Sequence, residues 1–422
     1  MFKHSKLGNT IDSEQKLAEF LGGYPEIMIF GAGSMAKKTL RHIYGFYKDV
    51  KISNIVVTKQ EKNPLYVYGL KVLEIENLKK NDDNVWLLVS TLEKFHSEIQ
   101  DALIAHGIDN FVFLESSVVD HWDDAPFLKQ DEFFLTERYT DPYFKVASDI
   151  CRERAFDDHQ RDQFFDEVFS DINTDKVCIP RLVVVLGTKC SLRCRDCNNL
   201  MPYFETPKDL DADKITDALK ILLKLSAHIL KCELIGGEPF LASGLESVLK
   251  FLLLEEKVCQ IEITTNGTII PKKELFPLLQ EDKVIIKISN YGKVVNQEKF
   301  ITCLQDNNIR FEVLKSERWI ASGDTEKRNR ETKELQKIYY SCSSALYCKT
   351  LLENRLYVCA RAASLDALHL MQERDFIEIS PTLSEKELKE AWLRTSLWAC
   401  DYCDYSIEDK QYVEPAIQVG RR

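Results

Sequence analysis

Three cysteines lie close together in the stretch "GTKCSLRCRDCNNL", at positions Cys190, Cys194 and Cys197. Thiolates bind soft metals and iron–sulfur clusters. A structural zinc site uses four closed protein ligands, whereas this group offers three. A four-iron cluster held by three cysteines keeps one iron open, just as a catalytic metal keeps a vacant position. The spacing therefore favours a cluster with an open iron, and zinc is the alternative.

The composition limits the classes of protein to which this chain can belong. Its 422 residues carry a net charge of -11, which argues against a general nucleic-acid binder. No apolar run is long enough for a membrane span, and the N-terminus lacks the apolar stretch of a signal peptide. We therefore expect a cytoplasmic protein that engages neither nucleic acid nor membrane. In that compartment, 13 cysteines point to metal ligands or catalytic groups rather than disulfides.

Strand and helix signals alternate in two regions, so the expected fold class is α/β with parallel sheets. In residues 1–115, apolar runs at 26–30, 52–57, 85–91 and 110–114 predict strands, and 92–107 predicts a helix. This region is expected to be a Rossmann-like sheet, and 116–178 a helical connector. From 179 to 330, five strand signals alternate with helical stretches, including 211–229 and 243–257. They predict a partial (β/α)6 barrel, with a small C-terminal extension over 331–422.

The first region contains "FGAGSMA", a G-x-G-x-x-A pattern between a strand and a helix. Gly31, Gly33 and Ser34 are candidate nucleotide contacts, because such glycines let a pyrophosphate approach the helix N-terminus. No acidic residue follows the second strand at 58–60, so classical NAD binding is not predicted. With "GLKVLEIENL" and "HGIDNFVFL", the region resembles the small Rossmann-like domain attached to enzymes of sugar and polysaccharide biosynthesis. A nucleotide-binding domain and a docking domain both stay open.

Three polar motifs end strands of the second region: "GGEP" at 236–239, "TTNG" at 264–267 and "ISNYG" at 288–292. Together with C-x3-C-x2-C, in this order, they are similar to the motifs of the radical SAM superfamily. The resemblance implies a 4Fe–4S cluster on Cys190, Cys194 and Cys197, and S-adenosylmethionine (SAM) beside it. The implied SAM contacts are Gly236, Gly237, Glu238, Pro239, Thr265, Asn266, Ser289 and Asn290. The carboxylate of Glu238 and the adjacent backbone are suited to accept hydrogen bonds from the methionyl ammonium.

One position departs from the family pattern. The residue before the last cysteine is often aromatic in the family, and here it is Asp196, so adenine stacking is not expected there. The family chemistry implies that one electron from the cluster cleaves SAM and that the resulting 5′-deoxyadenosyl radical abstracts hydrogen from a substrate. Such a reaction needs a low-potential electron donor such as flavodoxin or ferredoxin.

Five more cysteines occur near the C-terminus: Cys342, Cys348, Cys359, Cys400 and Cys403. Their spacing resembles the auxiliary-cluster region of radical SAM enzymes with a twitch or SPASM extension. Five cysteines suit one auxiliary 4Fe–4S cluster, with Cys348 as the spare thiol or an alternate ligand. A spare thiol near the substrate is able to donate a hydrogen atom. Asn354 stands where the family has a glycine, and Asn tolerates positive φ. A four-cysteine zinc site is the alternative.

These features together predict a radical SAM enzyme that acts on a carbohydrate, either a nucleotide-sugar or a glycan. Epimerisation and alcohol oxidation are the expected reaction types. One alternative is a maturase that modifies a peptide or protein, and another is a non-enzymatic iron–sulfur or zinc scaffold. Trp319 is a candidate for the lining of the substrate pocket, although a packing role is favoured. Arg361 is a candidate to bind a substrate phosphate or carboxylate, although an ordinary salt bridge is favoured.

Overall fold

The computed structural model describes residues 9–47, 50–61, 63, 66–67, 70–78, 85–120, 122, 146–147, 149–157, 160, 163–164, 167–168, 177–315, 317–392, 397–407 and 410–420. The chain divides into two compact units, 1–144 and 145–422. Each contains its own mainly parallel sheet, which confirms the predicted α/β class. No helix in the described part of the chain is both long and apolar enough to cross a membrane.

The first unit contains a seven-stranded sheet with the order β1-β7-β6-β2-β3-β5-β4, in which only β4 runs antiparallel to its neighbour. The strands are β1 (Asn9–Ile11), β2 (Glu26–Phe30), β3 (Lys51–Val57), β4 (Tyr66–Val67), β5 (Leu70–Glu74), β6 (Trp86–Val89) and β7 (Phe111–Leu114). The helices are α1 (Glu14–Gly23), α2 (Ser34–Phe46), α3 (His96–Ala105) and α4 (Ser116–Asp120). The predicted parallel Rossmann-like arrangement is therefore present.

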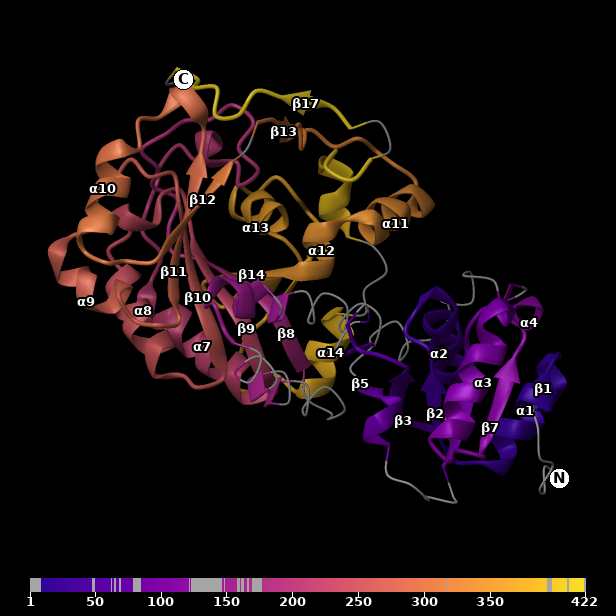
Figure 1. Cartoon of the computed structure of the whole chain (residues 1–422). Helices are drawn as coiled ribbons and strands as arrows, with labels where there is room; N and C mark the ends of the chain where they lie inside the picture. The colour runs from indigo at the N-terminus through magenta and orange to yellow at the C-terminus, as the bar shows by residue number, and fades with distance from the viewer. Residues whose placement is uncertain are drawn as a thin grey trace. The chain divides into compact units, whose positions relative to one another are not determined.

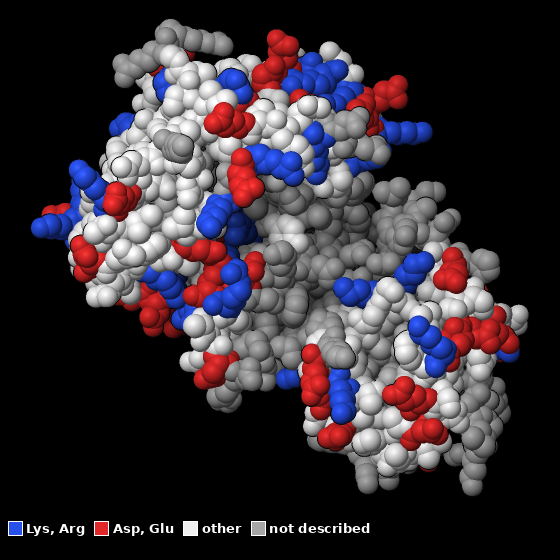
Figure 2. Space-filling view, turned by 45° about the horizontal axis from the view of Figure 1, so that its top comes forward, with Lys and Arg blue, Asp and Glu red and all other residues white. Residues whose placement is uncertain are grey.

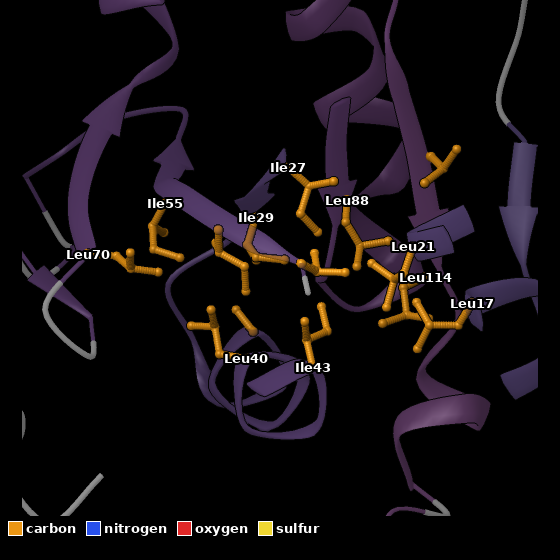
Figure 3. Packing of buried hydrophobic residues seen from close by; sticks show 14 of the residues in the cluster. Leu17, Leu21, Ile27, Ile29, Leu40, Ile43, Ile55, Leu70, Leu88 and Leu114 are labelled. Carbon is orange, nitrogen blue, oxygen red and sulfur yellow. The ribbon is translucent and has the colours of Figure 1, made fainter. Parts of the chain in front are cut away.

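Alternating apolar residues of β2 explain why helices cover both faces of this sheet. Ile27 and Ile29 pack with Leu40 and Ile43 of α2 in one cluster, which Figure 3 shows. Phe30 belongs to a second cluster that includes Ile99 and Leu103 of α3. The predicted helix at 92–107 begins as a short 3-10 turn, η2 (Glu93–Phe95), before α3. The predicted connector at 116–178 lies largely outside the described residues.

The second unit contains an eight-stranded sheet with the order β12-β11-β10-β9-β8-β14-β15-β16. The first six strands in this order are parallel, and β15 and β16 add antiparallel pairs at one edge. The strands are β8 (Val177–Val185), β9 (Ser226–Ile235), β10 (Val258–Thr265), β11 (Val284–Asn290), β12 (Phe311–Lys315), β14 (Cys348–Leu352), β15 (Arg355–Tyr357) and β16 (Phe376–Glu378). The sheet therefore continues past residue 330 into the segment predicted as a separate extension.

Helices α7 (Ala212–Leu225), α8 (Leu245–Leu254), α9 (Phe276–Leu279) and α10 (Glu298–Asp306) lie along one side of strands β9 to β12 (Figure 1). Asp211 caps α7 by accepting hydrogen bonds from the N–H groups of residues 213 and 214. The predicted helix at 211–229 was too long, because β9 begins at Ser226. Ser226 is fully buried and pairs with Val177, so strand pairing overrides the helical pattern there.

The remaining helices follow β12. They are α11 (Thr332–Ser341), α12 (Ser343–Tyr347), α13 (Ala360–Ala367) and α14 (Glu385–Trp392), with the 3-10 turn η8 (Trp398–Tyr402). Two short strands, β13 (Trp319–Ile320) and β17 (Tyr412–Val413), pair antiparallel near the tips of β11 and β12 (Figure 1). On the face seen in Figure 2, basic and acidic side chains are interspersed.

Charged side chains of the second sheet form a buried network. The Nζ atom of Lys231 lies 2.8 Å from Glu153 Oε2 and 2.8 Å from Glu262 Oε1, and all three side chains are at least 95% buried. Burial alone would raise the pKa of Glu153, but hydrogen bonds from Lys231 and Lys287 lower it to about 2. These groups satisfy one another, so the network is a structural element and not a ligand site.

Candidate active site at the carboxyl ends of strands β8 to β11

One pocket of about 120 Å³ collects most of the motif residues from the second region. Its lining includes Cys190, Cys194, Cys197, Gly236, Gly237, Thr265, Asn266 and Ser289. These residues follow or end β8, β9, β10 and β11, which are neighbouring parallel strands. The carboxyl ends of parallel strands share one edge of a sheet, which is why the sequence motifs converge there. Glu238, Pro239 and Asn290 were predicted with this group but do not line the pocket.

The two glycines of GGEP let the cysteine loop pack directly on the end of β9. Gly237 N donates to Gly187 O at 3.0 Å, and Glu238 N donates to Lys189 O at 2.8 Å. A Cβ atom on Gly237 would lie 2.3 Å from Lys189 O, and one on Gly236 would lie 2.5 Å from Gly187 O. Backbone atoms occupy both positions, so a side chain at 236 or 237 would displace the loop that carries Cys190.

Glu238 is buried at the ends of two neighbouring strands. Its side chain is 1% exposed. One carboxylate oxygen accepts from the hydroxyl of Thr265 at 2.7 Å, and the other accepts from the N–H of Asn266 at 2.9 Å. Burial raises the pKa of this carboxyl group. Glu238 thus fastens the end of β9 to the end of β10.

Asn266 approaches the cysteine loop directly. Its Nδ2 atom donates to Ser191 Oγ at 3.1 Å and lies 3.8 Å from Cys190 Sγ. Gln297, which the motifs did not reveal, donates from Nε2 to Asn266 O at 2.8 Å and to Ser289 O at 2.7 Å. Asn290 accepts from Gly292 N at 2.8 Å, so its side chain closes the following turn, and its contact with SAM stays a prediction.

Two aromatic rings complete the pocket. Tyr291 and Trp319 both line it, with ring centroids 5.3 Å apart and planes at 87°. Burial raises the pKa of Tyr291. A packing role was favoured for Trp319, and Tyr291 was not singled out. Asp196 instead pairs with Arg195 at 2.9 Å. An aromatic surface is therefore present, although it comes from the residue after β11 and from β13 and not from the cysteine loop.

The three thiols of the pocket have the character of soft-metal ligands. Burial raises the pKa of Cys190 to about 12, and it also raises the pKa values of Cys194 and Cys197. Cluster binding would displace these protons, because metal ligands bind as thiolates. Among the described residues, no three His, Cys, Asp or Glu side chains are arranged to hold a single metal ion, so the fit of a cluster rests on the type of donor and not on preformed geometry. Three sulfurs beside bare glycine backbone fit the donor set of an iron–sulfur cluster with one open iron.

The C-terminal cysteines occupy three separate segments. Cys342 follows α11, Cys359 precedes α13, and Cys400 and Cys403 lie at η8. Burial raises the pKa of Cys359 to about 12, and the nearby thiolates of Cys342 and Cys403 raise it further. Burial also raises the pKa of Cys400, and the thiolates of Cys359, Cys403 and Cys342 raise it further. Cys342 and Cys400 also pack on the same cluster of buried residues. Four cysteines match the number of ligands that one auxiliary cluster takes.

Cys348 has different neighbours. It is the first residue of β14, where it pairs with Arg181 of β8. Burial raises the pKa of Cys348 to about 11, and Arg181 and Glu233 are the charged groups that influence it most. The adjoining β14–β15 hairpin turns at Glu353, which has φ +51°, so the left-handed residue is not Asn354 as predicted. Cys348 as the spare thiol stays a prediction that this placement supports.

Arg361 does not form the expected salt bridge. The side chain is 2% exposed, and it donates from Nε and Nη2 to Tyr402 O at 3.2 and 3.0 Å. Its Nη1 atom is buried without a hydrogen-bond partner, and no carboxylate among the described residues pairs with it. Burial lowers its pKa, whereas the thiolates of Cys403 and Cys359 act in the opposite direction. The guanidinium therefore supplies a positive charge beside the second cysteine group.

In the first unit, packing explains part of the glycine pattern. Gly31 has φ +117°, and a Cβ atom there would lie 2.8 Å from Ser90 O at the end of β6. Gly33 caps α2 without a side-chain hydrogen bond, and Ser34 is the first residue of the helix. Gly31 is thus required for the contact between β2 and β6. Nucleotide binding at these residues stays a prediction.

Parts of this chain are similar to curated GTP 3′,8-cyclases, although no family model matches the chain. The match to the protein of Aquifex aeolicus is 35% identical over 115 residues, covering 25% of this chain and 34% of the relative. The match to the mitochondrial protein of Arabidopsis thaliana is 32% identical over 125 residues, covering 29% of this chain and 32% of the relative. The chain thus spans about a third of the length of these relatives.

Solved structures give weak global likenesses. "BtrN in complex with AdoMet and 2-DOIA" has a TM-score of 0.36 and 12% identity, covering 54% of this chain and 94% of that chain. Streptococcus suis SuiB bound to S-adenosylmethionine has a TM-score of 0.34 and 12% identity, covering 65% and 81%. The motifs that resemble those of the radical SAM superfamily converge on one pocket.

Proposed function

We propose that this chain is a radical SAM enzyme with a 4Fe–4S cluster on Cys190, Cys194 and Cys197. The single observation that carries this proposal is the pocket in which those three thiols meet the ends of β9, β10 and β11. When bound, the cluster and SAM supply one-electron cleavage of SAM and abstraction of a hydrogen atom from the substrate. An external low-potential donor such as flavodoxin or ferredoxin supplies the electron.

The protein residues hold and enclose the reactants. The backbone at Gly236 and Gly237 lines the pocket beside the three thiols, where the methionyl group of SAM would lie. Thr265, Asn266 and Ser289 offer hydroxyl and amide groups for hydrogen bonds to the ribose and carboxylate of SAM. Tyr291 and Trp319 offer an apolar surface on which a purine can stack. Asp196, which stands where the family often has an aromatic residue, cannot provide such a surface. The rings of Tyr291 and Trp319 also exclude water from the reacting atoms.

The second cysteine group is proposed to hold an auxiliary 4Fe–4S cluster on Cys342, Cys359, Cys400 and Cys403. Three observations support this assignment: Cys342 and Cys400 pack on one buried cluster, the neighbouring thiolates raise the pKa values of Cys359 and Cys400, and the cation of Arg361 acts on Cys403 and Cys359. In an alcohol oxidation, this cluster would accept the second electron. In an epimerisation, Cys348 would instead return a hydrogen atom to the substrate.

We propose a carbohydrate substrate, either a nucleotide-sugar or a glycan. The Rossmann-like first unit supports it, since such a sheet with a glycine loop is suited to the nucleotide part. The partial matches to GTP 3′,8-cyclases favour a second candidate, a purine nucleoside triphosphate. A peptide substrate is the remaining alternative within the same reaction class.

Anaerobic reconstitution with iron and sulfide, followed by SAM and dithionite, tests the reaction class. We expect about eight irons per chain, because each cube holds four, and formation of 5′-deoxyadenosine. If the reconstituted protein produces no 5′-deoxyadenosine, the proposed reaction class is wrong, and a non-enzymatic scaffold is the remaining function. Nucleotide-sugars, GTP and peptides, each incubated in D2O, then test the substrate. Deuterium in a sugar product indicates epimerisation, and a ketone without deuterium indicates oxidation. Turnover of peptide alone would exclude the carbohydrate proposal.

A further inference from the structure

The C-terminal segment 411–420, called here the C-terminal strap, joins two walls of the cysteine pocket. At one end, β17 pairs with β13, the strand that carries Trp319. Gln411 O also accepts from Ala321 N at 2.8 Å. Figure 1 shows this part of the chain, in yellow, passing the tips of β11 and β12 before the C-terminus. The strap therefore begins against the aromatic wall of the pocket.

At its other end, the strap pairs with the cysteine loop. Arg195 N donates to Ile417 O at 2.7 Å, and Val419 N donates to Arg193 O at 2.9 Å. These bonds lie on both sides of Cys194, which itself forms an antiparallel bridge with Gln418. Ala416 is fully buried, so the strap is packed against the protein at this end. More than 220 residues of sequence separate the partners, and no motif indicated this pairing.

The side chain of Gln418 makes three contacts that define its orientation. Its Oε1 atom accepts from Arg193 N at 2.7 Å. Its Nε2 atom donates to Ala416 O at 2.7 Å and to Cys194 Sγ at 3.3 Å. A flipped amide would direct its oxygen at a carbonyl and a sulfur, and its NH2 group at an N–H. The network therefore fixes the amide donor on the sulfur of Cys194.

A donor to a ligand sulfur matters more when the cluster is reduced, because the reduced cluster carries one more negative charge. Hydrogen bonds to the sulfurs are among the features that set the potential of iron–sulfur clusters. We propose that the C-terminal strap contributes to the properties of the cluster in the cysteine pocket. Within it, Gln418 is a positioning residue that orients Cys194 and raises the reduction potential of the cluster bound there. This inference rests on the proposed function.

The first test is a reductive titration of the reconstituted full chain. The electron paramagnetic resonance signal of the cluster that responds to SAM is measured at each potential. In Gln418→Ala we expect the equilibrium constant for reduction to fall about tenfold, which is 59 mV for a one-electron couple. Gln418→Glu keeps the length but replaces the donor by a carboxylate, so a larger fall is expected. Gln411→Ala is the matched control. It removes an exposed glutamine side chain from the same strap and leaves the backbone contact to β13 intact.

The second test needs no cluster and separates this inference from the proposed function. Hydrogen exchange of the full chain as isolated reports the protection of the 193–195 amides. We expect faster exchange at Arg193 in Gln418→Ala, because Gln418 Oε1 is the acceptor for that amide, and no change in Gln411→Ala. Unchanged exchange and an unchanged potential in Gln418→Ala would overturn the inference. A wild-type chain that takes up no iron would overturn the proposed function, and the effect on the potential with it.

Discussion

The two cysteine groups of the second unit are built in opposite ways. The first takes three thiols from one loop and places them in a pocket whose opposite wall is glycine backbone. The second takes four thiols from three segments, and two of them, Cys342 and Cys400, pack on the buried cluster around Tyr339. A buried cation, Arg361, accompanies the second group. A three-thiol site beside open space is suited to bind a reactant, whereas a four-thiol site beside a core is suited to hold a closed cluster.

The sharpest test of this difference removes one thiol of the first group. In Cys197→Ala, the first cluster has only two protein ligands left, so we expect complete loss of 5′-deoxyadenosine formation. The iron content should fall from about eight to about four per chain, because the second group is untouched. Iron and sulfide analysis with a SAM cleavage assay measures both. Retained cleavage of SAM would mean that the reaction occurs elsewhere.

A methyl group at Gly237 should have nearly the same effect without removing a ligand. The new Cβ atom would meet Lys189 O at 2.3 Å, so the cysteine loop must move. We expect Gly237→Ala to lose most of the first cluster and to destabilise the fold by about 1–3 kcal/mol. Gly33→Ala is the control, because a Cβ atom there meets nothing within 4 Å. Equal iron content and unfolding midpoints in the two variants would contradict the packing argument.

These two predictions use residues that sequence reasoning could find. The parallel sheets, β2 and the grouping of motifs at strand ends all follow from short-range patterns. The ends of α7 and the position of β14 do not, because they depend on which strands pair. The hydrogen bonds that Glu238 and Asn290 form within the protein could not be predicted either, because a motif does not show which groups its side chains contact. Gln297 and Gln418 escaped notice because their partners are far away in the sequence.

A thiol removed from the second group should leave the first group active. In Cys400→Ala, we expect the iron content to fall to about four per chain while SAM cleavage without substrate continues. Substrate oxidation should stop if the second electron leaves through the auxiliary cluster. Product analysis beside 5′-deoxyadenosine measurement separates the two steps. Loss of SAM cleavage together with loss of oxidation would show that the two sites are not independent.

Removal of the buried cation should change the second site without emptying it. Arg361→Met keeps an unbranched side chain and removes the charge beside Cys359 and Cys403. We expect reduction of the auxiliary cluster to become less favourable by on the order of 1 kcal/mol, because a nearby cation stabilises the more negative state. Arg355→Met is the control, since Arg355 is 41% exposed in its side chain and pairs with Asp366. Potentiometric titration of both variants measures the difference. Equal reduction potentials of the auxiliary cluster in the two variants would show that Arg361 does not act on it.

The smallest effect on iron content is expected at Cys348, and it decides whether the second group has four members or five. Cys348 pairs with Arg181 on β8 and is influenced mainly by Arg181 and Glu233, so it is not expected to be a ligand. Cys348→Ala should keep about eight irons per chain and the rate of SAM cleavage. If the reaction is an epimerisation, the same variant should lose solvent deuterium from the product, because the hydrogen donor is gone. A chain that instead loses about four irons would make Cys348 a ligand, and one of the other four thiols would then be the spare.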